Sequence, residues 1–219
     1  MSYSINALLL VVTILVSQPF LMDISDDPNY IEVLKLIDKK EYNKAEEVLE
    51  QLLEEYPDNP YILHNLGLVR AGQADLKGAS EYWRRAIKVD SRQKNSYLNL
   101  GIALIQMGEV EEAEGVLRTA LALFPMDAHL HYNLAVAIGY QGRYDEAIGE
   151  YEKVIELMPQ HLQALYNLAL LFQDIEPDRA VELWRRYLDL AREIPSEGRY
   201  VKEAEVYLQL AISKAVEGE

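Results

Sequence analysis

Residues 131–159 read HYNLAVAIGYQGRYDEAIGEYEKVIELMP, and this stretch decides the fold. Apolar residues recur at helical spacing on both sides of Gly142, at Leu134, Ile138, Ile148, Tyr151 and Ile155. The spacing predicts two helices that are joined by a turn at the glycine. Neither helix can bury its apolar face alone, so the pair must pack against neighbouring pairs.

The same pattern returns when the sequence is shifted by 34 residues. One copy contains Asn133, Leu134, Ala135, Gly142, Ala147 and Pro159, and these align with Asn99, Leu100, Gly101, Gly108, Ala113 and Pro125. Partial copies begin near Asn65-Leu66-Gly67 and Asn167-Leu168-Ala169, and another contains Tyr42, Ala45, Leu49 and Pro57. A fixed period of this length is typical of helix pairs that stack into a solenoid.

These markers resemble the tetratricopeptide repeat, in which Leu-Gly in a first helix is followed by alanines in a second helix and by a closing proline. The resemblance covers residues 26–195 in about five copies. It implies an all-α fold, a right-handed solenoid of helix-turn-helix repeats with a C-terminal capping helix. It also implies a concave surface that is lined by the first helices and that binds other proteins.

The repeat markers have physical reasons. Gly67, Gly101, Ala135 and Ala169 are expected to let the two helices of a repeat approach, with Ala79, Ala113 and Ala147 facing them from the second helix. Gly108 and Gly142 are expected to take the left-handed backbone conformation after the first helix.

The sequence divides the chain into a hydrophobic segment at 1–22, an acidic linker at 23–29, and a solenoid at 30–216 with its capping helix at 199–216. In the linker, Asp26 or Asp27 is expected to cap a helix that Pro28 opens.

The hydrophobic segment contains no charged side chain, and an uncharged run of about 18–20 residues is long enough to span a membrane as one helix. No basic residue precedes its apolar core and no small-x-small cleavage site follows. A single-pass N-terminal membrane anchor is therefore expected, with the side of the membrane left open. Two alternatives stay open: export to the periplasm or the extracellular space after cleavage, and a helix that packs on the solenoid or on a neighbouring copy.

Charge and composition limit the partners. The formal net charge is -15, which argues against nucleic acid because a phosphate backbone requires a basic surface. From Asp23 to Pro60 there are 12 acidic residues and 4 lysines, a local charge of -8. Such a field favours a basic partner, although acidic helix surfaces can also serve solubility alone. The chain has no cysteine, which excludes disulfides and a thiolate nucleophile.

The candidate binding residues lie on the first helices. An asparagine recurs at one position of four repeats, and stacking would align the four side chains as a ladder on the concave surface. A carboxamide both donates and accepts hydrogen bonds, so such a ladder suits the main chain of an extended peptide. Neighbouring apolar and aromatic residues would form the walls. The predicted groove consists of Asn65, Asn99, Asn133, Asn167, His64, Leu68, Ile102, Tyr132, Val136, Tyr166 and Leu170.

No catalytic motif is present in the sequence. Phosphate-binding loops, zinc-protease motifs and nucleophile elbows are absent, and His129 and His131 are two residues apart, so they point to different faces of a helix. No catalytic residue, metal site or cofactor is therefore expected.

These observations predict a non-catalytic adaptor or scaffold that binds a peptide or helix of a partner protein in its concave groove. The expected setting is a membrane or envelope complex. The alternative is a structural accessory subunit of a larger assembly, with permanent contacts through the N-terminal helix and the acidic surface.

Overall fold

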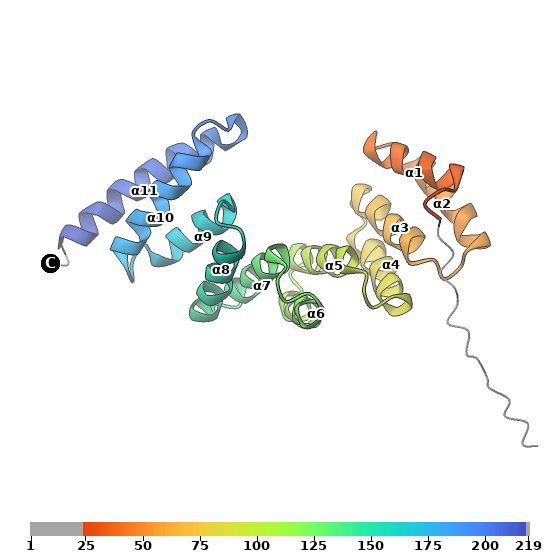
Figure 1. Ribbon diagram of the computed structural model, residues 1–219, viewed down its shortest axis with the longest axis horizontal. Helices are drawn as coiled ribbons and strands as arrows, with labels where there is room; N and C mark the ends of the chain where they lie inside the picture. Colours follow the sequence, from red (N-terminus) through yellow and green to blue (C-terminus); the bar gives the residue numbers. More distant parts are fainter. Residues whose placement is uncertain (1–23, 218–219) are drawn as a thin grey trace, which may run out of the picture.

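The computed structural model describes residues 24–217, and within this range the regular structure is entirely helical (Figure 1). The elements are α1 (Pro28–Asp38), α2 (Tyr42–Glu55), α3 (Pro60–Gly72), α4 (Leu76–Val89), α5 (Lys94–Met107), α6 (Val110–Leu123), α7 (Ala128–Tyr140), α8 (Tyr144–Leu157), α9 (Leu162–Phe172), α10 (Pro177–Ala191), the 3-10 helix η1 (Pro195–Glu197) and α11 (Gly198–Glu217).

Consecutive helices form pairs that stack along the chain. α1 packs on α2, α3 on α4, and so on to α9 and α10, while each second helix also contacts the first helix of the next pair. The stack bends into a broad U, with α1 and α11 at its two ends and α6 and α8 on the outside of the bend (Figure 1). This arrangement confirms the predicted all-α solenoid of helix pairs.

Helix starts and turns follow from local sequence. The α1 helix begins at Pro28, and the Asp27 carboxylate accepts hydrogen bonds from the backbone N–H groups of Asn29 and Tyr30 at 2.8 and 3.2 Å. Asp27 is therefore the N-cap, as predicted, and it satisfies two donors that the first turn leaves free.

In each of the first four repeats, the turn after the first helix contains a residue in the left-handed backbone conformation. Gly108 and Gly142 have φ values of +80° and +75°, which confirms their predicted role. The equivalent positions 68 and 34 residues before Gly108 are Lys40 and Ala74, with φ values of +59° and +65°. The turn geometry is thus kept in the first two repeats without a glycine, at a steric cost that glycine avoids.

The close approach of the two helices is confirmed at Gly67 and Gly101, and the atoms nearest to these glycines belong to side chains larger than the predicted alanines. A methyl group on Gly67 would lie 2.3 Å from the ring nitrogen of Trp83, and one on Gly101 would lie 2.7 Å from Leu117. Each of these large side chains is one turn beyond the alanine that we expected to face the glycine. The repeat therefore needs a small residue because a large core side chain crosses it.

The predicted pairing of Ala147 with Ala135 stays a prediction, and the structure shows a neighbouring contact of Ala147. Ala147 is fully buried, and its Cβ lies 4.0 Å from the point where a methyl group on Gly139 would stand. The alanine of the second helix therefore approaches the first helix near Gly139, one turn after Ala135.

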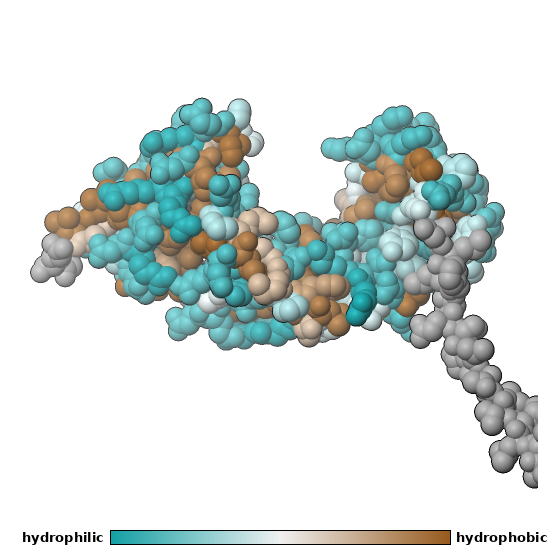
Figure 2. All heavy atoms as spheres, in the orientation of Figure 1, coloured by the Kyte–Doolittle hydropathy of each residue, from teal (hydrophilic) through white to brown (hydrophobic). Residues whose placement is uncertain are grey.

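Among the described residues, the core forms two apolar clusters. The first consists of residues from α1, α2 and α3 together with Ile24, and the second runs from α4 to α11. Trp184, Tyr187 and Phe172 are the largest fully buried side chains, and all three lie near the C-terminal end. Hydrophobic residues of the N-terminal arm, α1–α4, and of the C-terminal arm, α7–α11, appear within a largely hydrophilic surface in Figure 2.

Polar side chains link neighbouring repeats at recurring positions. The Gln73 amide donates to Glu46 at 2.9 Å, and the Gln141 amide donates to Glu114 at 2.9 Å, each across 27 residues of sequence. Arg143 also donates to Glu114 at 2.7 Å. Burial alone would raise the pKa of Glu114, but the hydrogen bonds from Arg143, Gln141 and Arg118 outweigh it and lower that pKa to about 2.

The α11 helix closes the stack, but its outer side is not wholly polar. Ala204 and Ala211 are buried against the solenoid, whereas Val206 and Val216 are 67% and 69% exposed and Leu210 is exposed as well. The expected capping helix with one apolar and one polar face is therefore present at the predicted place, with apolar residues on both faces.

The predicted membrane location is corrected. Between residues 24 and 217, none of the helices combines the length and the apolar character that crossing a membrane requires. The segment 1–22, to which an anchor, a cleaved signal or a packed helix was assigned, lies outside the described residues. A membrane location is therefore withdrawn.

Candidate functional site

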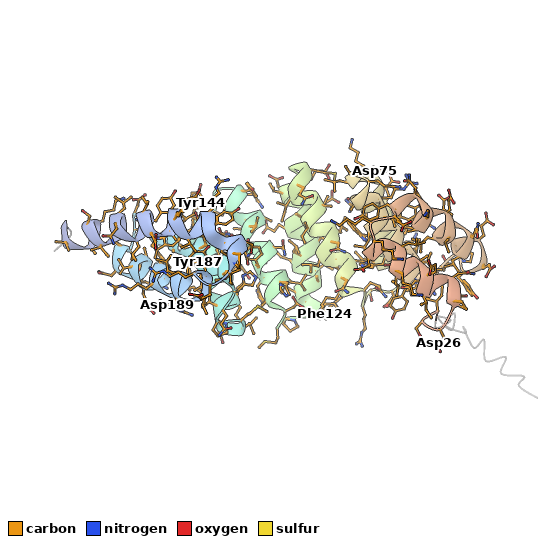
Figure 3. The ribbon with its side chains drawn as sticks, turned by 90° about the horizontal axis from the view of Figure 1, so that it is seen from above. Asp26, Asp75, Phe124, Tyr144, Tyr187 and Asp189 are labelled. Atoms are coloured by element: carbon orange, nitrogen blue, oxygen red, sulfur yellow. The ribbon has the colours of Figure 1, made fainter. Side chains whose placement is uncertain are left out.

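The predicted groove residues lie on α3, α5, α7 and α9, the first helices of four consecutive repeats. Figure 3 looks into the open side of the U and shows α11 in front of α10 on the C-terminal arm. The tyrosines that it labels, Tyr144 and Tyr187, lie on that same arm.

Two of the four asparagines bridge neighbouring repeats. The Asn65 amide donates to the hydroxyl of Tyr30 at 2.8 Å, and the Asn167 amide donates to the hydroxyl of Tyr132 at 3.4 Å. In each case the tyrosine stands 35 residues earlier, on the first helix of the preceding repeat. Asn167 also donates to Tyr151 at 3.1 Å. These amides therefore hold repeats together, a role that the sequence analysis did not assign to them.

The other two asparagines lack a tyrosine at that spacing. Asn133 donates to the carbonyl of His129 in its own helix at 2.8 Å. Asn99 is half-buried, and its side chain makes no hydrogen bond with any residue between 24 and 217. The positions 35 residues earlier are Leu98 and His64. The tyrosines could have been noticed in the sequence, because they keep the repeat spacing.

An apolar pocket lies between α7, α8 and α9. Its volume is 290 Å³, and it includes the predicted groove residues Val136, Asn167 and Leu170. Sequence reasoning missed its other lining residues, which are Gly139, Tyr140, Tyr144, Tyr151 and Leu171. Tyr140 and Tyr144 are 71% and 57% exposed, so two large aromatic rings stand in water at its rim. We call this cavity the apolar pocket.

A second pocket lies on the other side of Asn167 and has a volume of 260 Å³. It is lined by Tyr132, Gln163, Tyr166, Asn167, Tyr187, Glu197 and Tyr200, and we call it the tyrosine pocket. Of these residues, Tyr132, Tyr166 and Asn167 were predicted. The others come from α9, α10, η1 and α11, and those on η1 and α11 lie beyond the five repeats, so no repeat pattern indicates them.

Aromatic contacts fix the rings of the tyrosine pocket. The ring of Tyr166 meets those of Trp184, Tyr187 and Tyr200 edge-on, with centroids 5.0, 5.4 and 5.9 Å away. Tyr132 stacks on His161 at 4.8 Å. Edge-on contacts of this kind stabilise aromatic pairs beyond their buried area, so these rings are held in place before any ligand arrives.

Two carboxylates accept hydrogen bonds from these tyrosines. Tyr187 donates to Glu197 at 2.8 Å, and Tyr166 donates to Glu203 at 3.2 Å. Burial, followed by the charge of Glu203, raises the pKa of Tyr166 to about 12. Burial also raises the pKa of Tyr187, and Glu197 adds to the shift. Both phenols therefore stay protonated at neutral pH and keep their donor role.

The remaining predicted residues lie away from these two pockets. Leu68 and Ile102 are half-buried on α3 and α5. His64 on α3 places its Nδ1 2.9 Å from the Ser96 hydroxyl, and burial lowers the pKa of His64 to about 4.

The first repeat has no asparagine at the position that corresponds to the four predicted groove asparagines. Ile31 and Leu34 stand 34 residues before Asn65 and Leu68, and both side chains are exposed. They are not among the predicted groove residues, although the repeat period assigns them to the same face.

Within the described range, no group of three or more His, Asp or Glu side chains is placed to hold a metal ion. The arrangement instead offers aromatic rings, amides and carboxylates in two adjacent cavities. This chemistry suits recognition of another molecule.

Comparison with protein families gives consistent matches along the chain. Models described as "Tetratricopeptide repeat" match residues 34–59 and the overlapping ranges 64–128 and 98–138. A model described as "TPR repeat" matches residues 140–175. A search of curated proteins found no significant match.

Solved structures with the same fold include three instructive examples. MamA from Desulfovibrio magneticus RS-1 is 18% identical with a TM-score of 0.69, over 76% of this chain and 95% of its own. PilF of Pseudomonas aeruginosa is 20% identical with a TM-score of 0.68, over 88% of this chain and 92% of its own. A thermophilic TPR protein of Thermus thermophilus is 20% identical with a TM-score of 0.64, over 81% of this chain and 97% of its own.

Proposed function

Because the chain belongs to the tetratricopeptide repeat family, we propose that it is a non-catalytic scaffold that holds a segment of a partner protein along its concave face. The tetratricopeptide fold supports protein–protein interaction in general. The proposal adds where the partner binds and in what form: an extended peptide or a helix that lies across the first helices.

The observation that carries the proposal is the pair of pockets on either side of Asn167. A linear segment that crosses α9 would place successive side chains in the two cavities, as peptide grooves do when they alternate main-chain contacts with side-chain pockets. The amide of Asn167 lies between them and is braced by two tyrosine hydroxyls.

The asparagines of the middle repeats are the proposed main-chain contacts. The Asn99 carboxamide makes no hydrogen bond within residues 24–217, and Asn133 donates only to the carbonyl of His129 in its own helix, so both can turn to a ligand without breaking a link between repeats. A carboxamide that meets a peptide unit can donate to its carbonyl and accept from its N–H group. Partner contact at Asn65 is less favoured, because that side chain is 5% exposed.

The test is capture of a partner by the full-length chain and by groove variants. We expect Asn99→Ala combined with Asn133→Ala to weaken capture of the co-purifying protein while helical content and melting temperature stay nearly unchanged. Asn43→Ala, an exposed asparagine of α2, is the control and should capture normally. Unchanged capture by the double variant would show that these asparagines do not contribute to partner binding.

A structural accessory subunit is the second candidate, and one observation favours it. The exposed Val206 and Leu210 on the outer side of α11 resemble an unfinished packing face rather than a solvated cap. Permanent contacts would then run through this end of the stack and through the acidic surface. Val206→Lys combined with Leu210→Lys would release the partner in this case and would leave capture intact if the concave groove holds it.

A further inference from the structure

We propose that the tyrosine pocket receives the side chain of a lysine or arginine of the bound segment, so that the groove recognises a basic residue of the partner. This inference rests on the proposed function, since it names what one part of the groove recognises. It goes beyond the general attraction between an acidic scaffold and a basic protein, because it assigns the charge to one cavity.

Aromatic rings line the pocket. Tyr132, Tyr166, Tyr187 and Tyr200 come from four separate helices and line one cavity together with Glu197. The faces of aromatic rings carry negative electrostatic potential and attract ammonium and guanidinium groups. An aliphatic side chain could also fill a tyrosine-lined space, but it would not balance the charge of Glu197 at the pocket wall.

A carboxylate, that of Glu197, also lines the pocket. Glu197 accepts one hydrogen bond, from Tyr187, and makes no ion pair with any residue of the described range. The neighbouring Glu203 differs, because Arg199 donates to it at 3.1 Å. Glu197 is therefore a half-buried anion at the pocket wall whose charge a ligand can balance. A cation in this cavity would be attracted both by the aromatic rings and by the carboxylate, and each attraction would stabilise the complex.

The adjacent apolar pocket predicts a second feature of the ligand sequence. Asn167 belongs to both walls, so a segment that places a basic residue in the tyrosine pocket will place a nearby residue over Val136, Leu170 and Leu171. We therefore expect the recognised motif to combine a lysine or arginine with an apolar residue close to it in sequence.

The experiment uses a random dodecapeptide library that is selected on the immobilised full-length chain. Retained peptides are synthesised with their basic residue intact and with its uncharged isostere, citrulline for arginine or norleucine for lysine. Affinities are then measured in solution for both forms. We expect the charged form to bind about tenfold more tightly, a factor that corresponds to the upper range of a partly desolvated cation–π contact.

Variants locate this preference in the pocket. Glu197→Gln keeps the hydrogen-bond acceptor for Tyr187, and Tyr200→Leu removes an exposed ring; each should reduce the tenfold preference to nearly none. Glu193→Gln removes the same charge from an exposed site outside the pocket and should leave the preference unchanged. Binding of the uncharged peptides should be similar in all these proteins.

The outcomes separate this inference from the proposed function. Retained peptides that lack a basic residue, or a preference that survives Glu197→Gln, would overturn the inference and leave the scaffold proposal intact. An equal loss in the Glu193→Gln control would also overturn it, because the preference would then reflect the overall negative charge. If the library yields no peptide and partner capture ignores the groove variants, both the inference and the proposed function fall.

Discussion

The N-terminal arm, α1–α4, and the C-terminal arm, α7–α11, contain the same hydrogen bond in different surroundings. In each arm an asparagine donates to a tyrosine 35 residues earlier, as Asn65 does to Tyr30 and Asn167 does to Tyr132. The first pair is sealed in the core, whereas Asn167 lies between two pockets. The difference shows that repeat position determines which groups meet, while the neighbouring helices determine whether a ligand can reach them.

If both arms pair their helices in the same way, Ala147→Leu should have the largest effect on stability. Ala147 is fully buried between α7 and α8. Its enlargement should lower the free energy of unfolding by about 1–3 kcal/mol through overpacking. Chemical denaturation measures the loss. Gly149→Ala, two residues later, meets no atom within 4 Å and should raise stability by about 0.5–1 kcal/mol. A neutral Ala147→Leu would mean that the helix pairing is misassigned.

A pH dependence should arise in the N-terminal half, at His64. Burial lowers the pKa of His64 from 6.5 to about 4 in the folded chain, so the unfolded chain binds its proton more tightly. The stabilising contribution is complete above pH 6.5 and is lost as the pH falls through about 4. We expect a loss of about 2 kcal/mol, less than the full shift because the side chain is partly exposed.

The His64→Leu variant isolates this effect, because leucine stands at the same position of the next repeat, as Leu98. The variant should lose stability less steeply between pH 6.5 and 4 than the wild type in urea denaturation. Parallel curves for the two proteins would assign the pH dependence to other groups.

Removal of the buried Asn65 side chain should lower the free energy of unfolding more than removal of the Asn167 side chain, which lies between two pockets. Asn65→Ala leaves the buried Tyr30 hydroxyl without its partner and should lower the free energy of unfolding by about 1–2 kcal/mol. Asn167→Ala should cost less than about 1 kcal/mol, because water can enter the pockets and replace the amide. Asn99→Ala is the reference and should lie within about 0.5 kcal/mol of the wild type. Equal losses at Asn65 and Asn167 would contradict the contrast between the arms.

The smallest expected effect concerns the left-handed turn residues. Ala74→Gly should raise stability by about 1 kcal/mol by relieving a φ of +65°, and Gly142→Ala should lower it by a similar amount. Thermal melting of the two variants gives the comparison. Shifts of the same sign would show that the turns are not equivalent across repeats.

Much of the fold could be predicted because the repeat period ties each residue to equivalent residues in other copies. The turn at Gly142, the cap at Asp27 and the helix that Pro28 opens all depend on local chemistry, and the structure contains them. Packing partners were predicted less well. Gly67 and Gly101 were recognised as contact points, but Trp83 and Leu117 were not, because the period does not state how far a large side chain reaches.

The candidate site was predicted only in part, for a similar reason. Tyr132, Tyr166 and Asn167 belong to the repeat and were assigned to the groove, and whether a partner binds them stays a prediction. Glu197 and Tyr200 lie after the last repeat and meet them only because α11 folds back onto α10. No pattern with a period of 34 residues can indicate such a meeting.

The outer side of α11 has a consequence for the length of the molecule. A one-dimensional array can be extended wherever its last layer offers apolar side chains to a newcomer, and Val206, Leu210 and Val216 offer them here. A designed helix pair fused after α11 would therefore find a docking plane already in place, so this chain is a suitable starting module for longer engineered arrays.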